Sequence, residues 1–321
     1  MNAFLDFVAG FTNAYWVGVF TNVGIMMIAI MGVSILTGFT GLFSMGHAGF
    51  MALGAYGSAI FTKAFDLPFY LGVPVGILIA TAVGLIIGFP TLRLKGDYFT
   101  IATLGFGEVV KLAVENAQEL TGGARGTSDI PKFAEAGTAE RNTLIAFFIV
   151  WITAIVVIFL LKHFLNSRQG RNCVAIREEE MAATSIGVNT TKHKLLALGI
   201  SCALCGLAGA YLAHYMHYLH PNMFNNLKSN ELIMTVILGG RGSLTGTIIA
   251  SLVLVPLPEI LRINAAQEWR MVIYGLLVVV VIIFRPSGLM GNRELTWQGT
   301  KRFFKKLFSK KTKATGGANN G

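Results

Sequence analysis

The sequence predicts an all-α integral membrane protein, a polytopic helical bundle with short or broken spans. Of its 321 residues, 54% are hydrophobic and only 13% are charged, whereas soluble domains carry about a quarter charged residues. The apolar residues occur in runs of about 18 or more, the length that crosses a hydrocarbon core roughly 30 Å thick. Basic residues are concentrated in alternate loops between these runs. The composition leaves no room for a separate soluble domain.

Hydropathy and turn residues predict nine apolar segments. Segment 231–238 is short for a span, so it either crosses with help from its neighbours or forms a re-entrant pair with the next segment. We therefore expect seven or nine crossings within a transmembrane domain that covers residues 1–291. The segments are residues 15–36, 42–62, 69–92, 98–114, 143–161, 194–218, 231–238, 244–260 and 270–284.

The distribution of charge predicts the orientation. Arg93 and Lys95 follow the third segment, and six basic residues lie in the loop 162–194 that follows the fifth. Basic residues favour the cytoplasmic side, so we expect the N-terminus outside and this loop and the C-terminus inside. An even number of crossings must then follow Lys194. Residues 1–14 contain no Lys or Arg, so we expect the first span, not a cleaved signal peptide, to direct insertion.

The basic tail, residues 292–321, contains the sequence KRFFKKLFSKKTK at 301–313. Its phenylalanines and Leu307 fall on one helical face among lysines. This pattern predicts a helix that lies on the anionic lipids of the inner leaflet. The alternative is a solvated, positively charged tail.

Several other functions are disfavoured. The net charge of +10 does not indicate nucleic-acid binding, because no basic face alternates with base-stacking aromatic residues. Cys202 and Cys205 form a CxxC inside an apolar run, where small side chains pack between helices. TGGARG at 121–126 lacks the Lys and Ser or Thr that close a phosphate loop, and GGRGSLTG at 239–246 has the wrong spacing for a dinucleotide turn. We expect neither an enzyme nor a cofactor site in this chain.

Glycines interrupt the spans at two places that are candidates for a transport pathway. Gly46 and Gly49 flank His47 in the second segment, and Gly239, Gly240 and Gly242 follow the seventh. Glycines at such spacing either let helices pack closely or break a helix so that it lines a polar pathway. The two interpretations do not exclude each other.

Ionisable residues within the spans are few. Glu108 lies in an apolar segment with Lys111 three residues on, which favours a local ion pair over proton coupling. His214, His217 and His220 recur every three residues at the end of the sixth segment. They suit either a metal site or interfacial polar positions. We favour the interface, because no cysteine or carboxylate follows at the next turn.

The loop 170–189 predicts a short cytoplasmic helix that ends at Gly187. Glu179 and Glu180 precede Ala182 and Ala183, which form a small-residue face. Such a helix suits docking in a groove on a partner protein. It is equally compatible with a surface helix that has no partner.

Met181-Ala182-Ala183 with Gly187 resembles the EAA-x-x-x-G loop of bacterial ATP-binding cassette (ABC) importer permeases. The chain as a whole is similar to the LivM-type permeases of branched-chain amino-acid uptake systems. The similar stretches appear in the order of that family, and they are TGFTGLFSMGHAGFMALGAY (37–56), LRLKGDYFTIATLGFGEVVKL (92–112), LTGGARGTSDIP (120–131), AIREEEMAATSIGVN (175–189), ILGGRGSLTGTIIAS (237–251) and YGLLVVVVIIFRPSGLMG (274–291).

This resemblance implies one half of a heterodimeric pore in a bacterial inner membrane. The expected partners are a second related permease, two cytoplasmic ATPase subunits and an extracytoplasmic substrate-binding protein. The residues expected to couple to the ATPases are Glu179, Glu180, Ala182, Ala183 and Gly187. A related importer of urea or short amides is the nearest alternative, and a stand-alone secondary carrier or channel is a more distant one.

Overall fold

The computed structural model describes residues 14–94, 96–133 and 139–263, together with Gly275, Leu276, Val279, Ile283 and Gly288. Within these residues every element is helical, and the predicted all-α fold is confirmed. One isolated antiparallel bridge joins Thr127 to Leu219. The predicted span 270–284 lies almost entirely outside the described residues, and the tail helix at 301–313 lies wholly outside them.

The described helices follow one another with short connections. In chain order they are α2 (Ala14–Val33), η1 (Ser34–Phe39), α3 (His47–Phe65), α4 (Phe69–Thr91), α5 (Asp97–Asn116), α6 (Gln118–Thr121), η2 (Gly123–Arg125), α7 (Ala139–Asn166), α8 (Arg168–Glu178), α9 (Glu180–Ser185), α10 (Thr190–Met216), η3 (Pro221–Phe224), α11 (Asn226–Gly239), α12 (Leu244–Leu254) and α13 (Leu257–Ile263).

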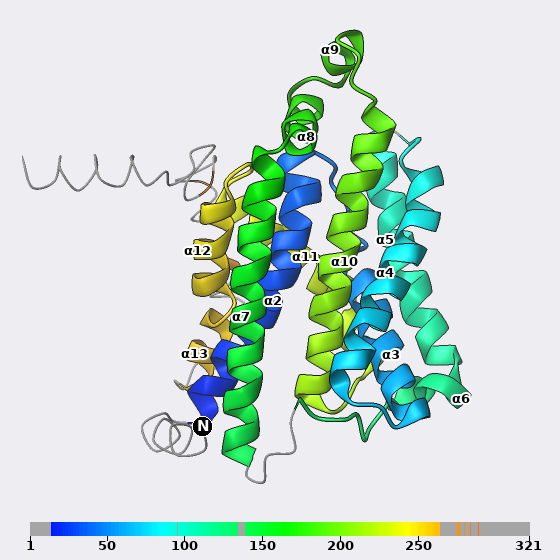
Figure 1. Cartoon of the computed structure of the whole chain (residues 1–321), viewed down its shortest axis with the longest axis vertical. Coiled ribbons are helices and arrows are strands. Elements are labelled where there is room, and N and C mark those ends of the chain that lie inside the picture. Colours follow the sequence, from blue (N-terminus) through cyan, green and yellow to red (C-terminus); the bar gives the residue numbers. More distant parts are fainter. Residues whose placement is uncertain are drawn as a thin grey trace, which may run out of the picture.

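Four helical segments are long and apolar enough to cross a membrane: Tyr15–Phe39, Phe69–Thr91, Glu140–Asn166 and Thr190–Met216. In Figure 1 the helices that contain them run along the long axis of one bundle. α11 and α12 are shorter, with 14 and 11 residues, as expected for broken spans. The protein is therefore embedded in the membrane, and the number of crossings stays a prediction.

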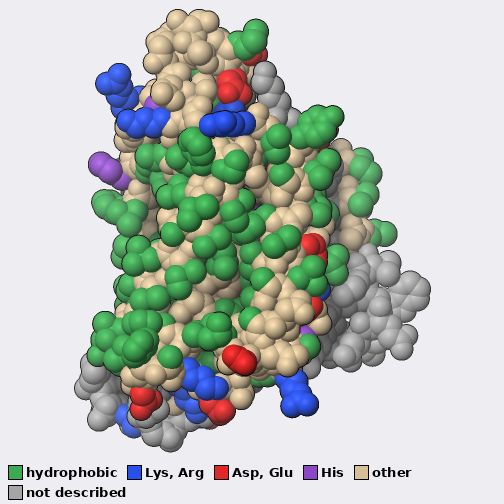
Figure 2. Space-filling model, turned by 90° about the vertical axis from the view of Figure 1, so that its right-hand side faces the viewer, with side chains coloured by type: hydrophobic (Ala, Val, Ile, Leu, Met, Phe, Trp, Pro, Cys, Tyr) green, Lys and Arg blue, Asp and Glu red, His purple; other side chains and the backbone are tan. Residues whose placement is uncertain are grey.

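The two ends of the bundle carry different elements. α8 and α9 project from one end, which we call the α9 end (Figure 1). α6 and the start of α2 lie at the other, which we call the α6 end. In Figure 2 charged side chains gather near both ends, and hydrophobic side chains dominate the face between them except for a few charged groups at one edge. This banding suits a bilayer.

Glycines bring α3, α4 and α10 into close contact in a seam of Gly54, Gly76, Gly206 and Gly209. A Cβ added to Gly54 would lie 2.2 Å from the carbonyl oxygen of Gly206, and one added to Gly76 would lie 2.5 Å from that of Gly54. Only glycine fits at such separations. Because lipid offers helices little hydrophobic drive to associate, this close packing contributes strongly to the bundle.

The second predicted span differs from the observed helix at its start. α3 begins at His47, and residues 42–46 form an irregular, non-helical connection after Gly41, which has φ +78°. α5 holds this connection, because the Thr100 hydroxyl donates to the Phe43 carbonyl at 2.9 Å and the Met45 amide donates to Thr103 Oγ1 at 3.1 Å. These contacts satisfy backbone groups that a helix would otherwise pair internally.

Candidate coupling surface and pathway residues

The predicted short helix of the loop 162–194 is two helices, α8 and α9. Ser167 caps α8 by accepting a hydrogen bond from the Gly170 amide at 3.3 Å. Glu179 has an extended backbone, with φ −160° and ψ 109°, and it separates α8 from α9. The extended backbone of Glu179 therefore makes a joint between the two helices.

α9 is fixed at both ends. At its start, the Glu180 carboxylate pairs with Lys194 of α10 at 2.5 Å. At its end, Gly187 has φ +84°, and the amides of Gly187 and Val188 donate to the carbonyls of Thr184 and Ala183 at 2.9 and 3.0 Å. This is a Schellman motif, which favours glycine at the left-handed position. A Cβ at Gly187 would meet nothing within 4 Å, so the backbone conformation alone disfavours a side chain there.

The two alanines of α9 do not share a face. Ala182 is exposed, whereas Ala183 is only 3% exposed and packs within this chain. The expectation that both alanines face a partner is therefore wrong for Ala183. The large apolar side chains exposed on α9 and its C-cap are instead Met181 and Ile186, each 78% exposed. Sequence reasoning missed them because it took the small residues of the motif as the contact face.

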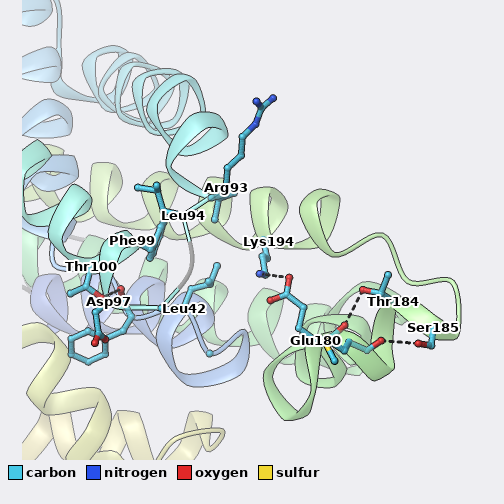
Figure 3. Close-up of a pocket in the computed structure, with 15 residues that line it drawn as sticks. Leu42, Arg93, Leu94, Asp97, Phe99, Thr100, Glu180, Thr184, Ser185 and Lys194 are labelled. Carbon is cyan, nitrogen blue, oxygen red and sulfur yellow. Dashed lines mark hydrogen bonds and ion pairs between the residues drawn. The ribbon is translucent and has the colours of Figure 1, made fainter.

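A cavity of about 770 Å³ lies between α9 and the turn from α4 to α5. Figure 3 shows Glu180 and Lys194 pointing toward one another on one side, with Leu42, Asp97 and Thr100 across from them. Apolar and charged side chains thus line the same hollow next to Met181. The α9 end therefore combines exposed apolar groups with charged groups, as protein interfaces do.

The glycines near His47 pack α3 against α5. A Cβ at Gly46 would lie 2.7 Å from the Thr103 carbonyl oxygen, and one at Gly49 would lie 3.1 Å from the Gly107 Cα. His47 is fully buried, and its Nδ1 lies 2.9 Å from the Ser44 carbonyl oxygen. Its Nε2 has no hydrogen-bond partner among the described residues. In this structure Gly46 and Gly49 serve close packing.

The glycines after α11 turn the chain. A Cβ at Gly239 would lie 2.7 Å from the Thr247 Cα in α12, so α11 and α12 pack closely. Gly240 and Gly242 have φ angles of +113° and +90°, which side chains strongly disfavour. Ser243 then caps α12 by accepting from the Gly246 amide at 3.0 Å. A tight turn therefore separates two short helices, as a broken span requires.

Comparison with known proteins identifies the family. The family model described as the permease component of branched-chain amino acid transport systems matches residues 15–282, most of the chain. The chain belongs to this family. Two relatives are named LivM, a high-affinity branched-chain amino acid transport system permease. The chain is 33% identical to LivM of Salmonella typhimurium over 297 residues, which are 85% of this chain and 69% of that protein. It is also 33% identical to LivM of Escherichia coli over 289 residues, which are 83% of this chain and 68% of that protein.

The permease also matches LivH of Escherichia coli, with 24% identity over 289 residues (84% of this chain, 92% of that protein). Identity is thus higher to the two LivM proteins of Salmonella typhimurium and Escherichia coli than to this LivH. No solved structure matches the permease significantly.

The ion pair expected inside the fourth predicted span is different in the permease. Glu108 is half-buried on α5. Lys111 pairs with Glu115 at 3.9 Å, four residues on, instead of with Glu108. Both spacings place the partners on one helical face, so sequence spacing does not distinguish them. A role for Glu108 in the transport pathway stays a prediction.

The three histidines of the permease occupy separate positions. His214 is buried, with Nε2 2.8 Å from the Ser58 hydroxyl and Nδ1 2.7 Å from the Pro131 carbonyl oxygen. His217 ends α10 with φ +59°. His220 caps η3, where its Nδ1 accepts from the Asn222 amide at 3.1 Å. Among the described residues, no three His, Cys, Asp or Glu side chains are grouped for a metal ion.

The CxxC cysteines are buried between helices. Cys202 and Cys205 are free thiols, and the sulfur of Cys205 lies 3.9 Å from the Ala29 carbonyl oxygen of α2. A Cβ at Gly84 of α4 would lie 2.4 Å from the Cys202 sulfur. These contacts support the interpretation that small side chains pack here.

Proposed function

We propose that this permease is one of two related subunits that form the pore of an ABC importer for branched-chain amino acids. The observation that carries this proposal is the α8–α9 pair, which projects beyond the bundle (Figure 1) and exposes Met181 and Ile186. A short helix with apolar anchors suits a groove on a partner. In an importer of this class the partner is an ATPase subunit, which supplies the energy that this chain does not.

The relatives support a paired pore. Escherichia coli has both a LivM and a LivH, two different proteins named as permeases of the same kind of transport system, and this chain is similar to both. We propose that this permease takes the LivM place beside a LivH-like partner. An extracytoplasmic binding protein would deliver the substrate to the α6 end.

Uptake assays test the proposed function. In bacteria lacking their own branched-chain uptake, we expect labelled leucine to enter only when this permease, the second permease, both ATPases and the binding protein are expressed together. Isoleucine and valine should compete, and urea and acetamide should not. An inactivated ATPase is the control. Uptake of urea or acetamide instead of leucine would favour the related importer, and uptake without the ATPases would favour a secondary carrier.

We further propose that the α9 end is cytoplasmic and that the N-terminus lies outside. Support comes from the basic residues Arg168, Arg171 and Lys192 around α8 and the start of α10, because basic loops stay inside. The start of α2 lies at the opposite end of the bundle (Figure 1).

Cysteine labelling tests this orientation. Ser185 in α9 and Ser128 after η2 are both exposed, and they lie toward opposite ends of the bundle. With a membrane-impermeant maleimide on intact cells, we expect Ser128→Cys to react and Ser185→Cys to react only after permeabilisation. Background should be low, because all three native cysteines are buried and burial raises the pKa of the Cys173 thiol. Equal labelling of Ser185→Cys in intact cells would contradict the scheme.

A further inference from the structure

Arg177 of α8 reaches into the bundle between a π-helical turn and a glycine turn of the transmembrane segments. Its Nη1 donates to the carbonyl oxygen of Gly38 at 2.9 Å. A Cβ added to Gly242 would lie 2.3 Å from the same nitrogen. The side chain is only 17% exposed, although α8 lies at the surface of the α9 end. One side chain therefore touches two segments that are far apart in the sequence.

The first of these segments is η1, a π-helical turn that continues α2. The Thr40 amide bonds to the Ile35 carbonyl, five residues back, so the turn is wider than in an α-helix. Single π-helical turns in helices are frequent at functional sites. Gly38 lies in this turn, and Gly41 follows it with φ +78°. A Cβ at Gly41 would lie 2.9 Å from Cγ of Arg177.

The second segment is the turn between α11 and α12. Gly38 and this turn are neighbours, because a Cβ at Gly38 would lie 3.7 Å from the Gly242 amide nitrogen. Ser34 at the start of η1 also faces Thr247 of α12, with their hydroxyl oxygens 3.4 Å apart. The absence of side chains at Gly41 and Gly242 leaves room for the arginine.

α8 is connected to α9, and both are anchored. The guanidinium also pairs with Glu178, the last residue of α8, and Glu179 then leads into α9, where Glu180 holds Lys194. A mostly buried guanidinium is costly unless it stays hydrogen-bonded. A shift of α8 must therefore either carry η1 with it or break the bond to Gly38.

We propose that Arg177 is the positioning residue through which movement of α8 and α9 reaches the π-helical turn η1 and the α11–α12 turn. The inference rests on the proposed function, because it supposes that an ATPase moves α9. The proposal assigns Arg177 no contact with substrate. Arg177 acts by holding η1 and the α11–α12 turn to the helix that the ATPase moves.

The test uses the complete importer reconstituted in liposomes, with ATP hydrolysis and leucine uptake measured on the same sample. For Arg177→Ala we expect normal assembly and ATP hydrolysis with at least a tenfold loss of leucine transported per ATP. The matched control is Arg171→Ala, because Arg171 is also on α8 but its guanidinium bonds only to the Asn166 carbonyl, at 2.7 Å, among the described contacts. The Arg171→Ala importer should transport as much leucine per ATP as the wild type.

The outcomes separate the inference from the proposed function. An inactive wild-type importer would count against the proposed function itself. If Arg177→Ala transports as much leucine per ATP as the wild type, whether or not hydrolysis and uptake fall together, Arg177 does not couple the two and the inference is wrong. Should Arg177→Ala fail to assemble, Arg177→Lys decides. This variant keeps the charge but lacks the planar fork of the guanidinium. A wild-type amount of leucine transported per ATP in Arg177→Lys would overturn the inference. A severalfold fall in leucine transported per ATP with normal hydrolysis would support it.

Discussion

Replacing Gly209 with alanine is expected to remove most of the folded permease from the membrane. A Cβ at this position would lie 2.0 Å from the carbonyl oxygen of Met51 and 3.0 Å from its Cα. These are backbone atoms of α3, so they cannot rotate aside as a flexible side chain would. Overpacking of this kind costs about 3 kcal/mol or more when the backbone must move, a large part of the stability of a typical domain.

The measurement is the amount of monodisperse detergent-solubilised protein and its thermal midpoint. Gly105→Ala in α5 is the matched control, because a Cβ there would meet nothing within 4 Å. Alanine is favoured over glycine in a helix by about 1 kcal/mol, so this control should equal or exceed the wild type. Equal behaviour of the two variants would show that the seam of α3, α4 and α10 is looser than described.

Replacing both Met181 and Ile186 with aspartate is expected to abolish copurification with the ATPases and leucine uptake. Both side chains are exposed, so the permease itself should fold and insert normally. At an interface, each change removes an apolar anchor and introduces a charge that must be desolvated. A combined loss of about 3 kcal/mol or more corresponds to a roughly hundredfold weaker association.

Leu120→Asp provides the control for this double variant. Leu120 is exposed in α6, at the opposite end of the bundle (Figure 1), and its replacement should leave ATPase association unchanged. Undiminished association of the double variant would locate the contact elsewhere, for example on the cavity between α9 and the α4–α5 turn. Loss of association in both variants would indicate a general defect.

The sequence by itself determined the class of the protein and much of its helix order. The apolar run that spans a membrane has a length set by bilayer thickness, so the long helices α2, α4, α7 and α10 were predictable from the apolar runs of the sequence. The start of α10 was predictable to within a few residues, as was the end of α9 at Gly187. These features depend on residues that are near one another in the chain, and a linear pattern records them.

The tertiary structure alone decided which side chains face inward and which glycines touch. Ala182 and Ala183 are adjacent and chemically identical, yet one is exposed and the other is buried, because burial depends on the helices packed around α9. Arg177 was one of several basic residues in a loop, and its bond to Gly38 joins positions 139 residues apart. Periodicity and charge patterns report the faces of single helices. They carry no information on which distant segment a face meets.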